Sequence, residues 1–102
     1  MVHASIAIQV LPQFSAGQED AEIVRVVDAV IAHIASTGLN YEVGPFETTV
    51  EGPYDDLMNI VRRANEICIE EGADQVACYV KIWYAPKHDI LTIDEKINKH
   101  KH

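Results

Sequence analysis

The sequence predicts an α+β fold of the ferredoxin-like type, a βαββαβ sandwich whose four-stranded antiparallel sheet carries two helices on one face. Three observations lead to this prediction. Segments with the polarity period of a strand or of a helix follow one another in the order strand, helix, strand, strand, helix, strand. A Gly-Pro pair separates the two middle strands, and Gly38 and Gly72 follow the two helices at equivalent places. Right-handed crossovers then place the first and third strands at the centre of the sheet and the others at its edges.

Length and composition limit the classes of protein to consider. The 102 residues (1–102) predict one domain with a single modest core, and a hydrophobic content of 48% argues against disorder. A formal net charge of −8 disfavours nucleic acid and anionic membrane surfaces as partners. No apolar run approaches the roughly 20 residues that span a bilayer, and the alternating start is typical of a strand rather than a signal peptide, so we expect a cytoplasmic protein. Cys68 and Cys78 are expected to be buried, reduced thiols.

The first half of the chain is predicted to contain a strand, a helix and a second strand. Residues 3–11 alternate between apolar and small or polar side chains, and Pro12 is expected to end this strand. Residues 20–37 carry an apolar stripe at helical spacing. Residues 40–43 form the next short strand, which the Gly-Pro turn joins to another at 46–51.

The second half repeats this order. Pro53 is expected at the first position of a helix over 54–71, which again carries an apolar stripe. The last strand covers 75–84. A short helix is predicted in the tail from Thr92 to Asn98, with Thr92 and Glu95 spaced as in a capping box.

One face of the predicted sheet has no helix to cover it. Its side chains come from the outward positions of the first and last strands: His3, Ser5, Ala7, Gln9, Ala77, Tyr79, Lys81 and Trp83. Such an aromatic face predicts a homo-oligomer, a dimer or a tetramer, with the alternative that the C-terminal tail folds across it. The rings of Tyr79 and Trp83 could also flank a flat aromatic or cationic ligand, although the sequence favours the simpler interpretation that they pack against a partner subunit.

Known catalytic and metal-binding patterns are not recognised. No nucleophile elbow, Gly-rich phosphate loop or metal-ligand spacing occurs, and His100 and His102 are interpreted as a solvated end. We therefore predict no catalytic residue, no metal and no enzymatic activity.

The segment 44–52 offers binding chemistry instead. It holds two threonines and the carboxylates of Glu47 and Glu51, which can accept hydrogen bonds from an exocyclic amine or balance a positive ring. Thr48 and Thr49 point to opposite faces, so at most one of them shares the open face with the carboxylates. The plainer interpretation is a β-hairpin with polar residues on its wet side.

An ordered set of residues along nearly the whole chain matches a known family. The set consists of Val10-Leu11-Pro12, Gly38, Tyr41, Gly44-Pro45, Thr48, Thr49, Glu51, Gly52, Asp55-Asp56-Leu57-Met58, Lys81-Ile82 and Lys96-Ile97. In these residues the chain resembles the thiamine-binding protein family, formerly an uncharacterised conserved family of about 100 residues. The resemblance implies a ferredoxin-like fold, dimers that pair into tetramers, and binding of thiamine or its hydroxymethylpyrimidine part without known catalysis.

Two positions depart from the family pattern. Glu47 stands where the family usually has a small residue, so it could narrow a pocket near the hairpin or add charge to it. Trp83-Tyr84-Ala85 stands where the family often has an arginine.

The sequence thus predicts one binding site near the sheet and a subunit interface. Thr48 and Glu51 are chosen from the resemblance, Ser5, Gln9 and Thr49 as polar groups, and Tyr41, Tyr79 and Trp83 as aromatic walls. The predicted function is non-catalytic binding of a small molecule, thiamine or a hydroxymethylpyrimidine-type compound, with no cofactor apart from thiamine as the bound ligand. The alternatives are a small enzyme on a dimeric ferredoxin-like barrel, such as a monooxygenase, and a pure oligomeric interaction module.

Overall fold

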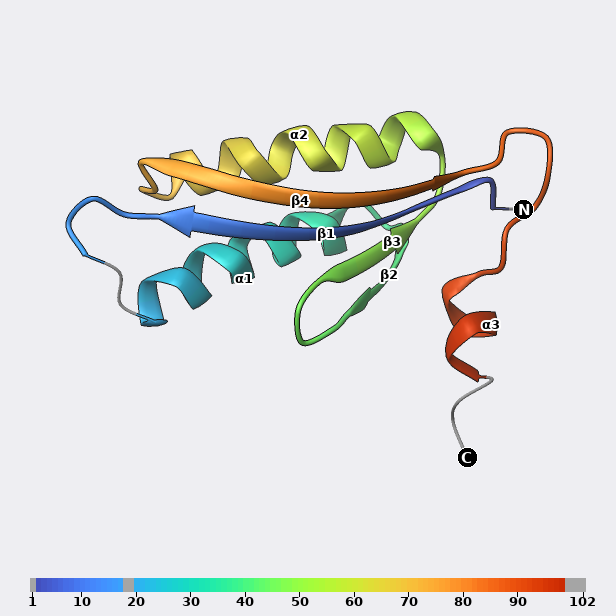
Figure 1. Ribbon diagram of the computed structural model, residues 1–102, viewed down its shortest axis with the longest axis horizontal. Coiled ribbons are helices and arrows are strands. Elements are labelled where there is room, and N and C mark those ends of the chain that lie inside the picture. The colour runs from blue at the N-terminus through green and yellow to red at the C-terminus, as the bar shows by residue number, and fades with distance from the viewer. Residues whose placement is uncertain (1, 18–19, 99–102) are drawn as a thin grey trace.

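The computed structural model describes residues 2–17 and 20–98 and has the predicted arrangement (Figure 1). Its elements are β1 (Ala4–Gln13), α1 (Asp20–Ser36), β2 (Asn40–Val43), β3 (Thr48–Glu51), α2 (Tyr54–Glu70), β4 (Gln75–Tyr84) and α3 (Ile93–Asn98). The strands form one antiparallel sheet in the order β2-β3-β1-β4. The ferredoxin-like prediction is confirmed, with the first and third strands at the centre.

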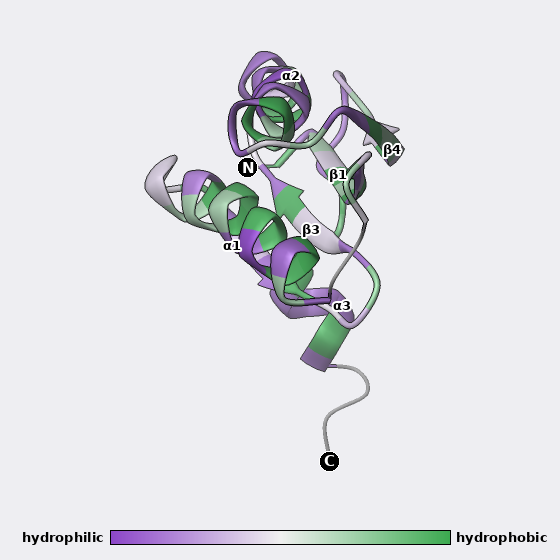
Figure 2. Ribbon diagram, turned by 90° about the vertical axis from the view of Figure 1, so that its left-hand side faces the viewer, coloured by the Kyte–Doolittle hydropathy of each residue, from purple (hydrophilic) through white to green (hydrophobic). Residues whose placement is uncertain are grey.

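Both long helices lie on one face of the sheet, as the end-on view shows (Figure 2). The core lies between these two layers, because the apolar stripes predicted for the helices face the alternate apolar positions of the strands. Its fully buried members include Ile6, Val26, Ile34, Val50, Leu57, Ile60 and Cys68. Cys68 is buried and Cys78 half-buried, both as free thiols, and burial raises the pKa of each.

The strands differ in length, and this difference corrects one prediction. β1 pairs with β4 from Ala4 to Gln13 but with β3 only from Ser5 to Ile8. The expectation that Pro12 ends the strand is wrong, since Pro12 pairs with Val76 inside the sheet.

Peptide-group orientation explains why a proline is tolerated there. The carbonyl of Ala4 accepts from Gly52 beside β3, whereas the carbonyl of His3 accepts from Ala85 beyond β4. Peptide groups alternate along a strand, so those of even-numbered residues face the β3 side. The N–H that Pro12 lacks would point to that side, where β3 has already ended, so no ladder bond is lost.

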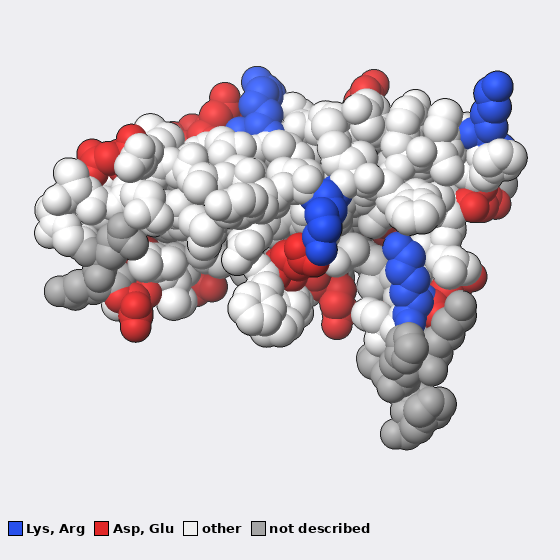
Figure 3. All heavy atoms as spheres, in the orientation of Figure 1, with Lys and Arg blue, Asp and Glu red and all other residues white. Residues whose placement is uncertain are grey.

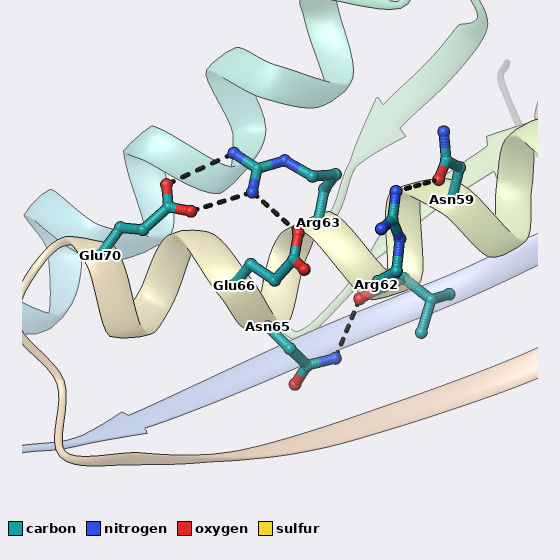
Figure 4. A network of polar contacts seen from close by, with 7 residues as sticks. Asn59, Arg62, Arg63, Asn65, Glu66 and Glu70 are labelled. Carbon is teal, nitrogen blue, oxygen red and sulfur yellow. Dashed lines mark hydrogen bonds and ion pairs between the residues drawn. The ribbon is translucent and has the colours of Figure 1, made fainter.

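Helix α2 shows a smaller correction and a polar outer surface. Pro53 is the residue before the helix rather than its first residue, with an extended backbone. On the outer surface Arg63 donates to Glu66 at 2.8 Å and to Glu70 at 3.0 Å (Figure 4). The hydrogen bonds from Arg63 lower the pKa of Glu70. No helix in the described part of the chain combines the length and apolarity needed to cross a membrane.

The tail helix α3 forms where the sequence predicts it. Thr92 Oγ1 accepts from the N–H of Glu95, whose carboxylate accepts from the N–H of Thr92, both at 3.1 Å, so the capping box is confirmed. α3 contacts the end of the sheet near β2 and β3, where Ile93 is 3% exposed. The tail therefore covers one end of the open face and leaves the rest uncovered (Figure 1).

Candidate functional site

A cavity of about 240 Å³ lies between α1, β1 and the turn that joins β2 to β3; we call it the hairpin cavity. Apolar side chains of α1 and β1 form its floor: Ile8, Val10, Ile23, Val27 and Ile31. The turn residues 43–47 and Thr48 form the opposite wall, and Gln9 lies at the edge of β1. The segment Gly44-Pro45…Thr48, on which the family resemblance depends, thus surrounds a cavity.

The cavity exists because two neighbouring strands differ in length. β3 begins at Thr48, opposite Ile8, whereas β1 continues to Gln13. The chain before β3 turns away from the sheet, and the N–H of Gly44 donates to the carbonyl of Glu47 at 2.9 Å to hold this turn. A Cβ at position 44 would approach that carbonyl oxygen to 2.9 Å, so the turn requires glycine.

The edge of β1 offers a donor and an acceptor inside the cavity. The peptide groups of Val10 face the β3 side, by the same alternation that accommodates Pro12. Since β3 has ended, no strand of the described part of the chain lies beside them, and Val10 lines the cavity. Thr48 adds a hydroxyl that bonds no other side chain or backbone group in the described part of the chain. A flat heterocycle could therefore pair with the strand edge much as another strand would.

Among the described residues that line the cavity, Glu47 alone is charged. Glu47 accepts from Lys81 Nζ at 2.8 Å, and these side chains are 36% and 75% exposed. This ion pair crosses over β1, because Lys81 on β4 lies opposite Ala7 of β1, whereas Glu47 precedes β3 on the other side of β1. The charge that the Glu47 departure adds is thus placed at the hairpin cavity.

The structure divides the predicted site residues between the two faces of the sheet. Thr48 pairs with Ile8 and Tyr41 with Val50, so both lie on the helix-covered side. The remaining predicted residues lie on the open face: Ser5, Gln9, Thr49, Glu51, Tyr79 and Trp83. Only Thr48 and Gln9 line the hairpin cavity, and Tyr41 packs against the core. The eight residues therefore do not form one pocket in a single chain.

Glu51 already has partners within the chain. Its side chain is 5% exposed; one carboxylate oxygen accepts from Asn40 Nδ2 and the other from the N–H of Ile93, both at 2.8 Å. It therefore holds α3 against the sheet. Its predicted role as a partner for a cationic ligand stays a prediction.

Few charged side chains lie on the open face (Figure 3). Tyr79 is 61% and Trp83 67% exposed on β4. In the described ranges 2–17 and 20–98, no cluster of three or more His, Cys, Asp or Glu could hold a metal ion. His100 and His102 lie outside the described residues.

Sequence reasoning missed the peptide groups of Val10 and the wall formed by Phe46, which is 79% exposed. No side-chain pattern identifies a strand-edge peptide as a binding group. The available signal was that the predicted strand 3–11 is longer than the predicted strand 46–51. Interpreting Pro12 as the end of the first strand hid how far that strand continues beyond its neighbour.

Comparison with known proteins agrees with the architecture. A family model described as thiamine-binding protein matches residues 6–101 of the chain. A UPF0045 protein of Clostridium perfringens is 48% identical over 97 residues, which cover 95% of this chain and 96% of that relative.

Two solved structures share the fold across nearly their full length. The domain of unknown function DUF77 from Bacillus cereus superposes with a TM-score of 0.85 at 36% identity, covering 99% of this chain and 93% of that one. A Thermotoga maritima protein assigned provisionally to thiamine biosynthesis or salvage gives a TM-score of 0.79 at 32% identity, with coverages of 96% and 98%.

Proposed function

Because the chain belongs to the thiamine-binding protein family, we propose that it binds thiamine or a hydroxymethylpyrimidine compound in the hairpin cavity without transforming it. The observation that supports this most strongly is the position of the family-like segment Gly44-Pro45…Thr48, which forms the cavity wall opposite the free edge of β1.

The cavity chemistry suits an aminopyrimidine. Such a ring carries an amine donor and a ring-nitrogen acceptor side by side on one edge, which match the carbonyl and N–H of Val10 on a strand edge. The Thr48 hydroxyl can bond a further ring nitrogen or the hydroxymethyl group, and the aliphatic floor packs against the ring faces.

Cavity size indicates which half of thiamine enters. A volume of about 240 Å³ lies just below the roughly 300–1,000 Å³ of typical ligand pockets. A pyrimidine fits inside, and the cationic thiazolium of thiamine would remain at the mouth. There the carboxylate of Glu47 can give up part of its ion pair with Lys81 and interact with the positive charge of the ligand.

The proposal is tested by calorimetric titration of ligand-free protein with thiamine and with hydroxymethylpyrimidine. We expect saturable binding of both. Chromatography of the mixture after long incubation should recover the ligand unchanged, whereas a converted product would favour the enzyme alternative. Absence of heat with either ligand at millimolar concentration would contradict the proposal.

We also propose that copies of this chain associate through the free edge of β4 and the part of the open face around Tyr79. Ten residues of β4 have a strand on one side only, and Tyr79 adds exposed aromatic surface beside them. Sedimentation velocity should show a dimer or tetramer that Tyr79→Glu dissociates; a wild-type monomer at micromolar concentration would contradict this. The two free thiols support a cytoplasmic location.

A further inference from the structure

The segment after β4 is held firmly against the start of the chain; we call residues 85–98 the tail strap. The ring Nδ1 of His3 lies 2.6 Å from the carbonyl oxygen of His88, to which it donates. The N–H of Ile90 donates to the carbonyl of Val2 at 2.8 Å. At its far end the strap continues into α3, which is anchored by the buried carboxylate of Glu51 on β3. The strap is therefore a fixed wall beside the sheet.

A second cavity, of about 400 Å³, lies between this wall and the end of β4; we call it the tail cavity. Its principal lining residues are Trp83, His88, Asp89, Ile90, Leu91 and Lys96. Among the described residues, none lines both this cavity and the hairpin cavity. A ligand bound here would be a different one, or a different part of the molecule, from the ligand of the hairpin cavity.

The aromatic wall of the tail cavity is the indole of Trp83. It is 67% exposed although it neighbours the buried Ser5 in the sheet. Ile90 and Leu91 of the strap supply apolar surface to the same cavity. An exposed indole beside aliphatic side chains favours a planar aromatic ring, which gains both stacking and apolar contact.

The charges of the tail cavity favour an anionic group on that ring. Lys96 of α3 lines the cavity, and within residues 2–17 and 20–98 no carboxylate lies within ion-pair distance of its ammonium. The carboxylate of Asp89 is instead directed to His3, with 3.7 Å between Oδ1 and Nε2. A lysine that has no carboxylate partner among the described residues can bind an anion, even in a chain of net charge −8.

We propose that the tail cavity binds a planar aromatic molecule carrying an anionic group, with its ring on Trp83 and the anion on Lys96. This inference does not rest on the proposed function, because the ligand charge is opposite to that of thiamine and the cavities are separate.

The test uses the full chain and the fluorescence of Trp83, which is its only tryptophan. Nicotinate and nicotinamide serve as ligands, because they share a planar ring and differ in charge. We expect nicotinate to quench the indole saturably and to bind about tenfold more tightly than nicotinamide, the difference between a charge-assisted and a neutral hydrogen bond.

Two strap variants locate the anion contact. Lys96→Gln should lower the affinity for nicotinate to the affinity for nicotinamide. Lys87→Gln is the matched control, since it removes an exposed lysine of the same strap that does not line the cavity. Equal affinity for the two compounds, quenching that does not saturate, or equal losses in the two variants would each overturn the proposal.

Discussion

Replacing Thr48 by valine removes one hydroxyl and nearly preserves side-chain shape, so it tests the hairpin cavity directly. Thr48 is 7% exposed, lines the cavity and has no competing hydrogen bond to any described residue. A hydrogen bond between neutral groups contributes about 0.5–1.5 kcal/mol net, which corresponds to about twofold to tenfold weaker binding. We expect Thr48→Val to weaken hydroxymethylpyrimidine by that factor in a calorimetric titration.

The neighbouring threonine supplies the matched control. Thr49 lies on the same strand, but its side chain points to the open face opposite Ala7. Thr49→Val should leave the affinity for hydroxymethylpyrimidine unchanged, and thermal unfolding of both variants should confirm that each is folded. Weakening by Thr49→Val with none by Thr48→Val would refute the placement of the ligand and move it to the open face.

Three further predictions concern carboxylates. Glu47→Gln should weaken the binding of thiamine several-fold in calorimetry while hardly changing the affinity for the neutral hydroxymethylpyrimidine. Equal losses of affinity for the two ligands would exclude charge pairing at the cavity mouth. Glu51→Gln should lower the free energy of unfolding by about 1–3 kcal/mol and speed hydrogen exchange at the N–H of Ile93, because an amide cannot accept with both of its atoms; unchanged exchange there would contradict the anchoring role. Hydrogen bonds from Ser15 lower the pKa of the Asp74 carboxyl in the folded protein. Asp74 therefore contributes its full stabilisation above the pKa of an unfolded aspartate, and this stabilisation is lost as the pH falls through the lowered pKa of the folded state. Urea unfolding below about pH 4 should therefore show a smaller loss of stability in Asp74→Asn than in the wild type, and parallel profiles would rule out this linkage.

Periodicity predicted the fold because β1 and the two long helices each have a buried apolar face. The stripe at Val26, Val30 and Ile34 faces the alternate apolar residues of β1. Helical spacing of the apolar residues identifies α1, and strict alternation identifies β1. The position of Pro12 was not predictable in the same way. Whether proline ends a strand depends on whether its peptide side faces a neighbour, and that is decided by where β3 stops.

The candidate site was predicted only in part for a related reason. The hairpin segment indicated the correct region, since Thr48 lies in the cavity wall. Sequence alone could not decide which of Thr48 and Thr49 faces the cavity, because the alternation holds equally for either register. Glu51 resembles a binding residue in sequence, yet its carboxylate anchors a helix 42 residues away along the chain.

Amide chemical shifts in a hydroxymethylpyrimidine titration show whether a pyrimidine pairs with the free edge of β1. We expect the N–H signal of Val10 to shift with saturation, together with that of Thr48, while the amide signal of Tyr79 remains in place. Shifts that gather on Tyr79 and Trp83 and leave Val10 unchanged would contradict it.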